Sequence, residues 1–448
     1  MPTASPPSLA PRLRGQARAL ALELYAEARA EWGYASDLIA SAFRKQRQLG
    51  SGDRRLVAET VYGLIRWDRR LEAISEEVLA RRRERREALS PVARGELALL
   101  IYELRQGLSV EPEEFRRLLH GVPDLTAITG EDAGLGSKSG LEREAVRRSF
   151  PTWLLERLVA DWGEAEALAL ADAMNRRAPL AIRVNTLKIS RDALTARLAN
   201  EGIVARPAPL SPFGLLLETR VNVFGLGAFG EGLFEVMDEG SQLVAEAVAP
   251  PPGGKLVDAC AGAGGKTLAL AALLGGQGRI LALDPNGKKL EELRRRARRA
   301  GLSSVAAREL KENRLPDEAR LGAWDRVLVD VPCSGLGTLR RNPEARWRLR
   351  PATVDAFPAQ QLSLLVTYAP LVAVGGRLVY ATCSVLRSEN DQVIERFLAE
   401  RPDFVLMPVK EIWGKERALP LGGGTVLRLA PHQHDTDGFF AAVLRRVQ

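Results

Sequence analysis

Three cysteines are the side chains of this sequence best suited to covalent chemistry. Cys333 stands in the run DVPCSG and Cys383 in the run ATCS, each directly after a stretch of apolar residues. The carboxyl ends of parallel strands line a shared crevice, so we expect both thiols to face one cleft. A cysteine in a turn beside polar residues can ionise, which makes each thiol a candidate nucleophile. Cys260 lies in a glycine-rich run, and we interpret it as a small packing residue.

Two thiols and a carboxylate suit methylation of cytosine at carbon 5, an atom that is a poor nucleophile. A thiolate that adds to carbon 6 pushes electron density onto carbon 5. A second base then removes the carbon 5 proton, and a carboxylate near ring nitrogen 3 steadies the charge that develops. We assign these three roles to Cys383, Cys333 and Asp330.

A glycine-rich loop, DACAGAGGKT, follows an apolar run and opens a helical one, where a nucleotide-like ligand meets backbone amides. A Walker A loop requires glycine where Cys260 stands, and a dinucleotide loop requires glycine where Thr267 stands, so neither pattern fits. The remaining interpretation is a loop that binds S-adenosyl-L-methionine. Asp284 ends the next apolar run about 20 residues later, where a carboxylate suits the ribose hydroxyls.

Strands alternate with helices from Gly240 onward. The expected strands are KLVDACA, RILALD, DRVLVDVP and GRLVYATCS. Helices are expected to begin at Lys266, Gly287 and Ser388, and a long helix is expected near Ala359 to Val372. This alternation predicts a mostly parallel, doubly wound α/β sheet.

The residues before Gly240 predict a different organisation. Apolar residues recur at helical spacing from Pro11 to His120, which indicates an all-helical domain. Glycine, serine and proline without a clear period follow, and they favour a linker. A helical stretch is expected to resume at Pro151 and to run to Met174. The division that we expect is a flexible tail at 1–12, a helical domain at 13–122, a linker at 123–150, a helical and small α/β bridging subdomain at 151–236, and a catalytic domain at 237–448.

Composition and charge narrow the class of partner. The chain has 64 Lys and Arg residues against 56 Asp and Glu residues, a net charge of +8, so an anionic polymer is the natural partner. No apolar run is long enough to cross a membrane, and the N-terminus lacks a secretory pattern, so we expect a cytoplasmic location. Three separated cysteines and three histidines argue against a disulfide framework and a metal site. We interpret the runs Arg81–Arg86 and Arg294–Arg299 as solvated helix faces, with RNA contact as the alternative.

The motifs, taken in order, resemble the Nol/Nop/Sun family of RNA cytosine-5 methyltransferases, and most closely the bacterial Sun/Fmu (RsmB-type) ribosomal RNA enzymes. The resemblance runs from about Leu180 to the C-terminus and is carried by LAIRVNTLK, VMDEGSQLVAEAV, DACAGAGGKT, LALDPN, DRVLVDVPCSGLGTLRRNP, YATCSVLRSEND and HDTDGFFAAVLRR. The N-terminal third, with its VYGLIRW segment, is similar to the NusB-like RNA-binding domain of this subgroup.

The resemblance implies a class I Rossmann-like methyltransferase domain, preceded by an all-α NusB-like domain and a small α/β bridging subdomain. It implies that Cys383 is the attacking nucleophile, that Cys333 assists proton removal and RNA release, and that Asp330 contacts the cytosine. The contacts that it implies for S-adenosyl-L-methionine are Cys260, Ala261, Gly262, Ala263, Gly264, Gly265, Lys266, Asp284, Glu309 and Asp330.

The chain departs from the family pattern in two runs. Gly262-Ala263 replaces the usual Ala-Pro of the glycine loop, and the run MDE at 237–239 replaces QDE. Glu309 is the nearest candidate for the acidic residue on the adenine side.

The resemblance also implies the RNA partner. Arg183, Arg340 and Arg341 are expected to position RNA or the catalytic loop. We expect small-subunit (16S) ribosomal RNA as the substrate, with a transfer RNA cytosine-5 methyltransferase or a non-catalytic RNA-binding assembly factor as the alternatives. Nothing in the sequence demands a dimer.

Overall fold

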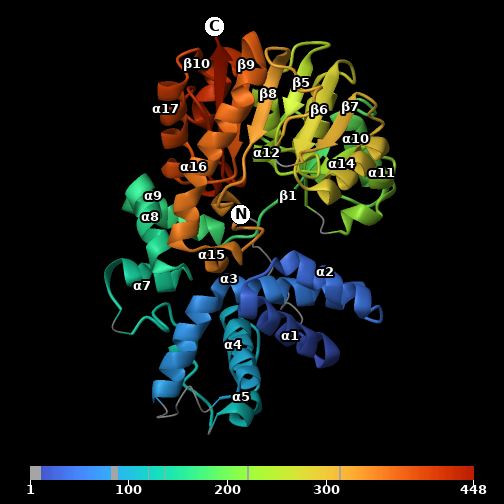
Figure 1. Ribbon diagram of the computed structural model, residues 1–448. Coiled ribbons are helices and arrows are strands. Elements are labelled where there is room, and N and C mark those ends of the chain that lie inside the picture. The colour runs from blue at the N-terminus through green and yellow to red at the C-terminus, as the bar shows by residue number, and fades with distance from the viewer. Residues whose placement is uncertain (1–11, 82–88, 120, 137, 219–220, 312–313) are drawn as a thin grey trace. The chain divides into compact units, whose positions relative to one another are not determined.

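The computed structural model describes residues 12–81, 89–119, 121–136, 138–218, 221–311 and 314–448 (Figure 1). The chain divides into two units. We call them the helical unit, which extends to Asn175 and includes Leu339–Pro351, and the sheet unit, which comprises Arg176–Thr338 and Ala352–Gln448. The expected tail, apart from its last residue Arg12, and most of the Arg81–Arg86 run lie outside the described residues. Arg12 forms ion pairs with Glu103 and Glu114.

Amphipathic helices build the helical unit, because their apolar residues recur every three or four positions. In α3, for example, Val57, Val61, Leu64 and Ile65 are all buried. The Ser90 side chain caps α4 by accepting a hydrogen bond from the Ala93 amide at 3.2 Å. The helices are α1 (Gly15–Glu31), α2 (Ala35–Lys45), α3 (Ser51–Arg81), α4 (Pro91–Arg105), α5 (Pro112–Leu118), α6 (Thr126–Thr129), α7 (Gly140–Arg147), α8 (Thr152–Trp162), α9 (Glu164–Met174) and α15 (Ala345–Arg348).

The helical N-terminal region expected from the sequence is confirmed, with two local differences. Residues 123–150, expected as a linker, contain α6 and α7, and the Ile128 and Val146 side chains of these helices are buried. The single helical stretch expected over Pro151 to Met174 forms two helices. Gly163 separates them, because its φ of 77° is outside the helical range.

Residues Leu339–Pro351 belong to the helical unit, although their neighbours on both sides in the chain belong to the sheet unit. The Trp347 indole donates a hydrogen bond to the Ile65 carbonyl at 2.8 Å. The buried Arg346 guanidinium donates to Asn175 Oδ1, also at 2.8 Å. The chain therefore leaves the sheet unit shortly after Cys333 and returns to it through α16.

A small antiparallel sheet with the strand order β2-β3-β1-β4 forms one part of the sheet unit. Its core contains Ile182, Leu215 and Phe234 from the strands and Leu194 and Leu198 from a helix. The elements are β1 (Leu180–Val184), α10 (Arg191–Asn200), β2 (Ala205–Pro207), β3 (Gly214–Leu217), η2 (Val223–Gly225), α11 (Gly227–Gly230) and β4 (Phe234–Val236).

The larger sheet has the strand order β10-β12-β9-β8-β5-β6-β7, with β11 paired to β12. Neighbours from β7 to β9 run parallel, and β10, β11 and β12 are antiparallel additions. The predicted doubly wound, mostly parallel sheet is therefore confirmed (Figure 1). Its strands are β5 (Lys255–Asp258), β6 (Arg279–Asp284), β7 (Val305–Glu309), β8 (Trp324–Asp330), β9 (Val372–Thr382), β10 (Phe404–Met407), β11 (Leu427–Leu429) and β12 (Phe439–Arg446).

The helices expected at Lys266 and Gly287 begin within one residue of those positions, but the long helix expected from Ala359 begins at Pro351, and two further differences follow. The long helix α16 ends at Tyr368, and β9 already begins at Val372, because Pro370 in the intervening turn cannot continue the helix ladder. A short 3₁₀ turn at Arg387–Glu389 precedes α17, which therefore begins at Asp391. The helices are α12 (Glu239–Ala247), α13 (Gly265–Leu273), α14 (Gly287–Ala300), α16 (Pro351–Tyr368), α17 (Asp391–Glu400), α18 (Lys410–Trp413), α19 (Lys415–Ala418) and α20 (Pro431–His434), with 3₁₀ turns η3 (Leu336–Thr338), η4 (Ala369–Leu371), η5 (Arg387–Glu389) and η6 (Leu419–Leu421).

The described part of the chain contains no helix that could cross a membrane. No helix there is both long enough and apolar enough to span a bilayer.

Candidate functional site

The carboxyl ends of β5, β6, β8 and β9 meet along one edge of the larger sheet. β8 pairs with β9 so that Asp330 lies opposite Ala381, and the Val331 amide extends the ladder to the Ala381 carbonyl at 3.0 Å. On the other side of β8, Asp258 pairs with Leu328. The loops that follow these strands therefore start from neighbouring positions, and they carry most of the site residues predicted from the sequence.

The structure brings the two predicted thiols together. The Cys333 and Cys383 sulfur atoms lie 3.3 Å apart, and both side chains are half-buried. The hydrogen bond with Cys383, followed by burial and by the charge of Cys383, raises the pKa of Cys333 well above its usual value. Cys333 is therefore protonated near neutral pH and can donate a hydrogen bond to the Cys383 sulfur.

Lys266 and Asp330 form an ion pair next to the thiols. The Lys266 ammonium lies 2.6 Å from Asp330 Oδ2, and the two side chains are 12% and 26% exposed. Burial is the largest influence on Lys266 and lowers its pKa, but the charge and hydrogen bond of Asp330 outweigh it, so the pKa is raised. Lys266 therefore stays charged and fixes the position of the Asp330 carboxylate.

The glycine loop between β5 and α13 leaves room for a ligand. Gly262 and Gly264 have φ values of 53° and 86°, which favour glycine. A Cβ atom added at Gly262 or Gly265 would meet no atom within 4 Å, whereas one at Gly264 would lie 2.6 Å from Leu293 Cγ. The Gly262 amide donates to Asp284 Oδ2 at 2.9 Å, so this loop and the end of β6 are held together.

Asp258 is buried at the base of the same loop. Its Oδ2 atom accepts a hydrogen bond from the Thr267 hydroxyl at 2.6 Å. Among the described residues, no hydrogen-bond partner contacts its Oδ1 atom, which is also buried. Burial, the largest influence, raises the pKa of Asp258 to about 7. This carboxyl group therefore titrates close to neutral pH.

The remaining predicted cofactor contacts lie around this loop. The Ala261 amide donates to the Leu283 carbonyl at 2.9 Å. Cys260 packs against the core of the sheet unit, and burial raises the pKa of its thiol. Glu309 is exposed at the end of β7, directly opposite Asp284 in the parallel ladder.

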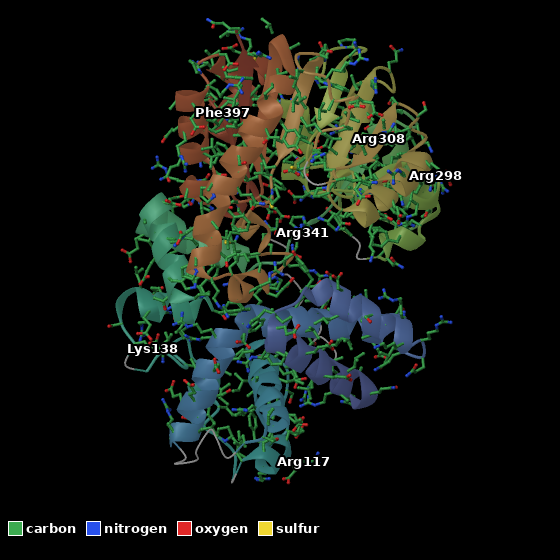
Figure 2. The ribbon with its side chains drawn as sticks, in the orientation of Figure 1. Arg117, Lys138, Arg298, Arg308, Arg341 and Phe397 are labelled. Atoms are coloured by element: carbon green, nitrogen blue, oxygen red, sulfur yellow. The ribbon has the colours of Figure 1, made fainter. Side chains whose placement is uncertain are left out.

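The Arg294–Arg299 run on α14 is a solvated face only in part, since Arg294, Arg295 and Arg298 are exposed. Arg296 and Arg299 are 15% and 17% exposed, and both form ion pairs with the buried Glu235 carboxylate of β4. Arg296 also donates to the Ala263 carbonyl of the glycine loop at 2.7 Å. Arg298, in contrast, is exposed and points outward from the sheet unit (Figure 2). The sequence did not reveal the two less exposed arginines, because β4, whose Glu235 pairs with them, is far away in sequence.

The three arginines expected to position RNA or a loop have different environments. Arg183 is 4% exposed and donates to the Val184 carbonyl at 3.2 Å, and burial lowers its pKa to about 10. Arg340 is 3% exposed within the helical unit, where its carbonyl accepts a hydrogen bond from Arg66 at 3.0 Å. Arg341 is half-buried (Figure 2). The Arg183 side chain therefore holds the backbone of its own strand, and the Arg340 backbone anchors the Arg66 side chain.

Sequence reasoning missed Glu389, which lies in the quoted run YATCSVLRSEND. Its side chain is fully buried and accepts hydrogen bonds from both Ser334 and Ser384. These serines directly follow the two cysteines. The only signal in the sequence was a carboxylate shortly after a candidate nucleophile, which does not identify its partners.

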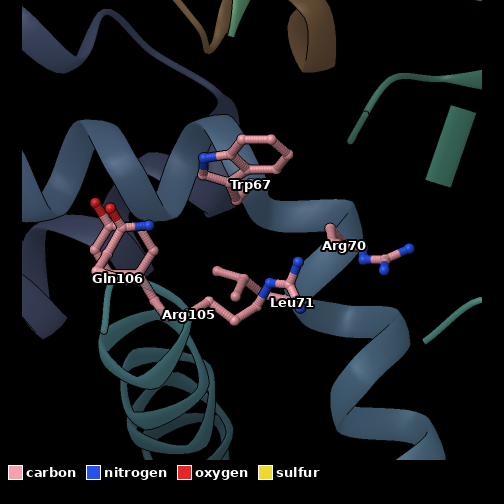
Figure 3. A pocket seen from close by; sticks show the side chains of 6 residues that line it. Trp67, Arg70, Leu71, Arg105 and Gln106 are labelled. Atoms are coloured by element: carbon pink, nitrogen blue, oxygen red, sulfur yellow. The ribbon is translucent and has the colours of Figure 1, made fainter. Parts of the chain in front are cut away.

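A cavity of about 120 Å³ lies in the helical unit, between α3 and the end of α4 (Figure 3). Arg105 extends across it from α4 towards Leu71, and Gln106 and Trp67 form other parts of its wall. Burial lowers the pKa of Arg105, and its guanidinium donates to the Ile128 carbonyl at 2.9 Å. Among the described residues, the lining contains two guanidinium groups and no carboxylate, and consists of Trp67, Arg70, Leu71, Tyr102, Arg105 and Gln106.

Comparisons with known proteins agree with this architecture. Residues 245–445 match the family model described as 16S rRNA methyltransferase RsmB/F, and residues 150–224 match the ferredoxin-like domain of RsmF/B-like methyltransferases. A probable ribosomal RNA small subunit methyltransferase B from Synechocystis sp. is 34% identical over 96% of this chain and 99% of its own length. The Bacillus subtilis protein of the same name is 29% identical over 96% of this chain and 98% of its own. The crystal structure of PH0851 is similar with a TM-score of 0.78 and 27% identity, over 97% of this chain and 100% of that one.

Proposed function

Because this chain belongs to the RsmB/F family of 16S rRNA methyltransferases, we propose that it methylates carbon 5 of a cytosine in small-subunit ribosomal RNA. The observation that carries the proposal is the 3.3 Å approach of Cys333 and Cys383. Cytosine methylation at carbon 5 needs one thiol that attacks and a second group that assists the loss of a proton, and this pair supplies both.

The glycine loop fits S-adenosyl-L-methionine as the methyl donor. The open space at Gly262 and Gly265 and the orphan Asp258 Oδ1 atom are features that a ligand can fill and satisfy. The loop from Cys260 to Lys266 would hold the methionine end, Asp284 the ribose and Glu309 the adenine side. When bound, this cofactor supplies an electrophilic methyl group.

Each step on the RNA side falls to a residue of the site. The Cys383 thiolate adds to carbon 6 of the cytosine, and electron density moves to carbon 5. Asp330, held by Lys266, contacts the cytosine near ring nitrogen 3, and the positive charge of Lys266 offsets the negative charge that develops there. Once carbon 5 carries the methyl group, Cys333 in its thiolate form accepts the carbon 5 proton, and the electron pair of that bond re-forms the double bond between carbons 5 and 6. The bond between carbon 6 and the Cys383 sulfur then breaks, which regenerates the thiolate and releases the methylated RNA.

The adduct itself favours the role of Cys333. The hydrogen bond to Cys383 and the charge of Cys383 both raise the pKa of Cys333 in the free protein. When the Cys383 sulfur is bonded to carbon, it carries no negative charge, so these two influences disappear. The Cys333 thiol then loses its proton to water more readily, so more of it is the thiolate that can accept the carbon 5 proton.

The target base must leave its stack to reach the thiols, so the substrate would be an unpaired segment of ribosomal RNA. We propose that the helical unit binds this RNA. Its cavity supports the proposal, because guanidinium groups suit phosphate oxygens and the Trp67 ring suits an unstacked base.

Bisulfite sequencing of RNA from cells with and without the gene tests the function. A single 16S cytosine that loses methylation in the deletion strain, and regains it with the wild-type gene but not with Cys383→Ser, is the expected result. A transfer RNA cytosine that changes instead would redirect the substrate. No change at any cytosine, together with retained RNA binding by the purified protein, would favour a non-catalytic assembly factor.

A further inference from the structure

We propose that Glu389 is the positioning residue that holds the Cys333 and Cys383 loops at reacting distance. Glu389 lies in the 3₁₀ turn that follows β9, outside the residues assigned above to catalysis or cofactor binding. The effect of Glu389 on catalysis rests on the proposed function, whereas its effect on the distance between the two sulfurs does not.

The Glu389 carboxylate bonds to both loops at once. Its Oε1 atom accepts hydrogen bonds from the Ser334 and Ser384 hydroxyls, each at 2.5 Å. Its Oε2 atom accepts from the Ser334 amide at 2.8 Å and from Gln361 Nε2 at 3.0 Å. A carboxylate has about four acceptor sites, so these bonds satisfy the buried charge. Since the two serines are the residues next to the cysteines, one anion fixes where both loops turn.

Neighbouring contacts keep Glu389 itself in place. The Tyr380 hydroxyl donates to the Glu389 carbonyl at 2.5 Å from inside the sheet. The next residue, Asn390, accepts a hydrogen bond from Thr382 at 2.7 Å and donates to the Ser384 carbonyl at 3.1 Å. The anchor is therefore held on several sides, and loss of the carboxylate would leave the two loops joined by weaker links, such as the 3.2 Å bond between the Ser334 and Ser384 hydroxyls.

Two substitutions separate the geometry of this group from its charge. In Glu389→Gln, the amide oxygen can take the Oε2 position and accept from the Ser334 amide and Gln361. The amide nitrogen then takes the Oε1 position and donates to the two hydroxyls, which can act as acceptors. In Glu389→Ala, the carboxylate bridge is lost, and the 3.2 Å hydrogen bond between the Ser334 and Ser384 hydroxyls is the side-chain link that remains. If Glu389 acts by positioning the loops, Glu389→Gln should therefore keep the reaction rates that Glu389→Ala lowers.

The spacing of the sulfurs can be measured without RNA. Diamide oxidises two neighbouring thiols: one thiolate adds to its N=N bond, and the second displaces the resulting hydrazide, which leaves a disulfide and a hydrazine. We expect the linked Cys333–Cys383 peptide, quantified by mass spectrometry, to form at similar rates in the wild type and in Glu389→Gln. In Glu389→Ala, we expect it to form at least roughly tenfold more slowly, since a misplacement of about 1 Å is costly to a two-centre reaction.

Methyl transfer provides the second measurement. For Glu389→Ala we expect a kcat roughly 10- to 100-fold lower, a KM for RNA within about twofold of the wild type, and recovery of kcat with glutamine. Folding of each variant is checked by circular dichroism. If alanine prevents folding, Ser384→Ala removes one of the two hydroxyl bonds instead, and both rates should fall.

Each outcome decides the inference. A folded Glu389→Ala protein that links its cysteines and turns over at wild-type rates overturns it, and so does Ser384→Ala with unchanged rates. If linking is slow in alanine and restored in glutamine, but even the wild type transfers no methyl group to RNA, the spacing role stands and the proposed function fails.

Discussion

The sulfur of Cys333 lies 3.3 Å from the sulfur of Cys383, although 50 positions separate them in the sequence. The approach follows from the sheet, because the parallel neighbours β8 and β9 end at the same edge. A disulfide would bring the sulfurs to about 2.05 Å, so this separation is that of two free thiols in contact. Two thiols in contact allow one to attack a substrate while the other handles its proton.

We predict that Cys333→Ala accumulates a covalent complex with RNA. Addition of Cys383 to carbon 6 does not require Cys333, but elimination does, so turnover stalls after methyl transfer. The adduct is measured as a slowly migrating band on a denaturing gel with labelled 16S RNA. Multiple-turnover kcat should fall by roughly 10²–10⁴, the usual contribution of a proton-transfer group.

The matched control is the double variant Cys333→Ala with Cys383→Ser, which lacks the attacking thiol and should give no band. A band that persists in the double variant would assign the attack to another residue. A Cys333→Ala protein that turns over normally without any band would remove Cys333 from the mechanism.

The cysteine pair could be predicted from the sequence because a parallel sheet gathers strand ends by rule. Apolar runs that ended in Asp330-Val-Pro-Cys333 and Thr382-Cys383 were enough to place both thiols at one edge. Glu389 could not be found in this way. Its partners come from three separate segments, and only the fold brings them to one carboxylate.

Two neighbouring glycines should respond differently to the same change. Gly264→Ala places a Cβ 2.6 Å from Leu293 Cγ at a φ of 86°, and should destabilise the protein by about 2–4 kcal/mol. Gly265→Ala meets no atom within 4 Å, so the free energy of unfolding should change by no more than about 0.5 kcal/mol. Urea unfolding of the ligand-free protein measures both values.

Calorimetry with S-adenosyl-L-methionine completes this comparison. Gly265→Ala should weaken cofactor binding, because its methyl group enters the space proposed for the ligand. Unchanged cofactor affinity in a stable Gly265→Ala protein would move the methionine end of the ligand away from the start of α13.

Asp258 should make stability depend on pH. Its pKa is about 7 in the folded protein, against an ordinary value of 3.8 for an aspartate in an unfolded chain, so the folded protein retains a proton that the unfolded chain releases. The free energy of unfolding should therefore fall as the pH rises from about 4 to 7, by up to about 4 kcal/mol. Urea unfolding at intervals across this range measures the slope.

Asp258→Asn removes the titrating group and should flatten that part of the profile, while the exposed Asp317→Asn should follow the wild type. Identical pH profiles for wild type and Asp258→Asn would mean that folding does not raise the pKa of Asp258.

The arginines show why charge patterns were harder to interpret than the site. Arg296 and Arg299 looked like part of a solvated run, but they hold Glu235 of a strand about sixty residues earlier, with separations of 61 and 64 positions. Arg346 lies in a segment that leaves the sheet unit to pack in the helical unit. Local charge spacing carries no information about either partner, because both contacts depend on tertiary packing.

The cavity of the helical unit should respond to a single added charge. Gln106 is exposed on its wall, so Gln106→Glu introduces a negative charge beside Arg105 without disturbing the core. If the cavity receives an RNA phosphate, the repulsion should cost about 1 kcal/mol, a roughly fivefold loss of affinity. Filter binding of 16S RNA at two salt concentrations measures the loss, which should shrink at the higher salt because exposed charges are screened.

Gln48→Glu makes the same change at another exposed position of the helical unit and should leave affinity within about twofold of the wild type. Equal losses in both variants would indicate a general effect of net charge, and no loss at Gln106 would remove the cavity from the RNA interface.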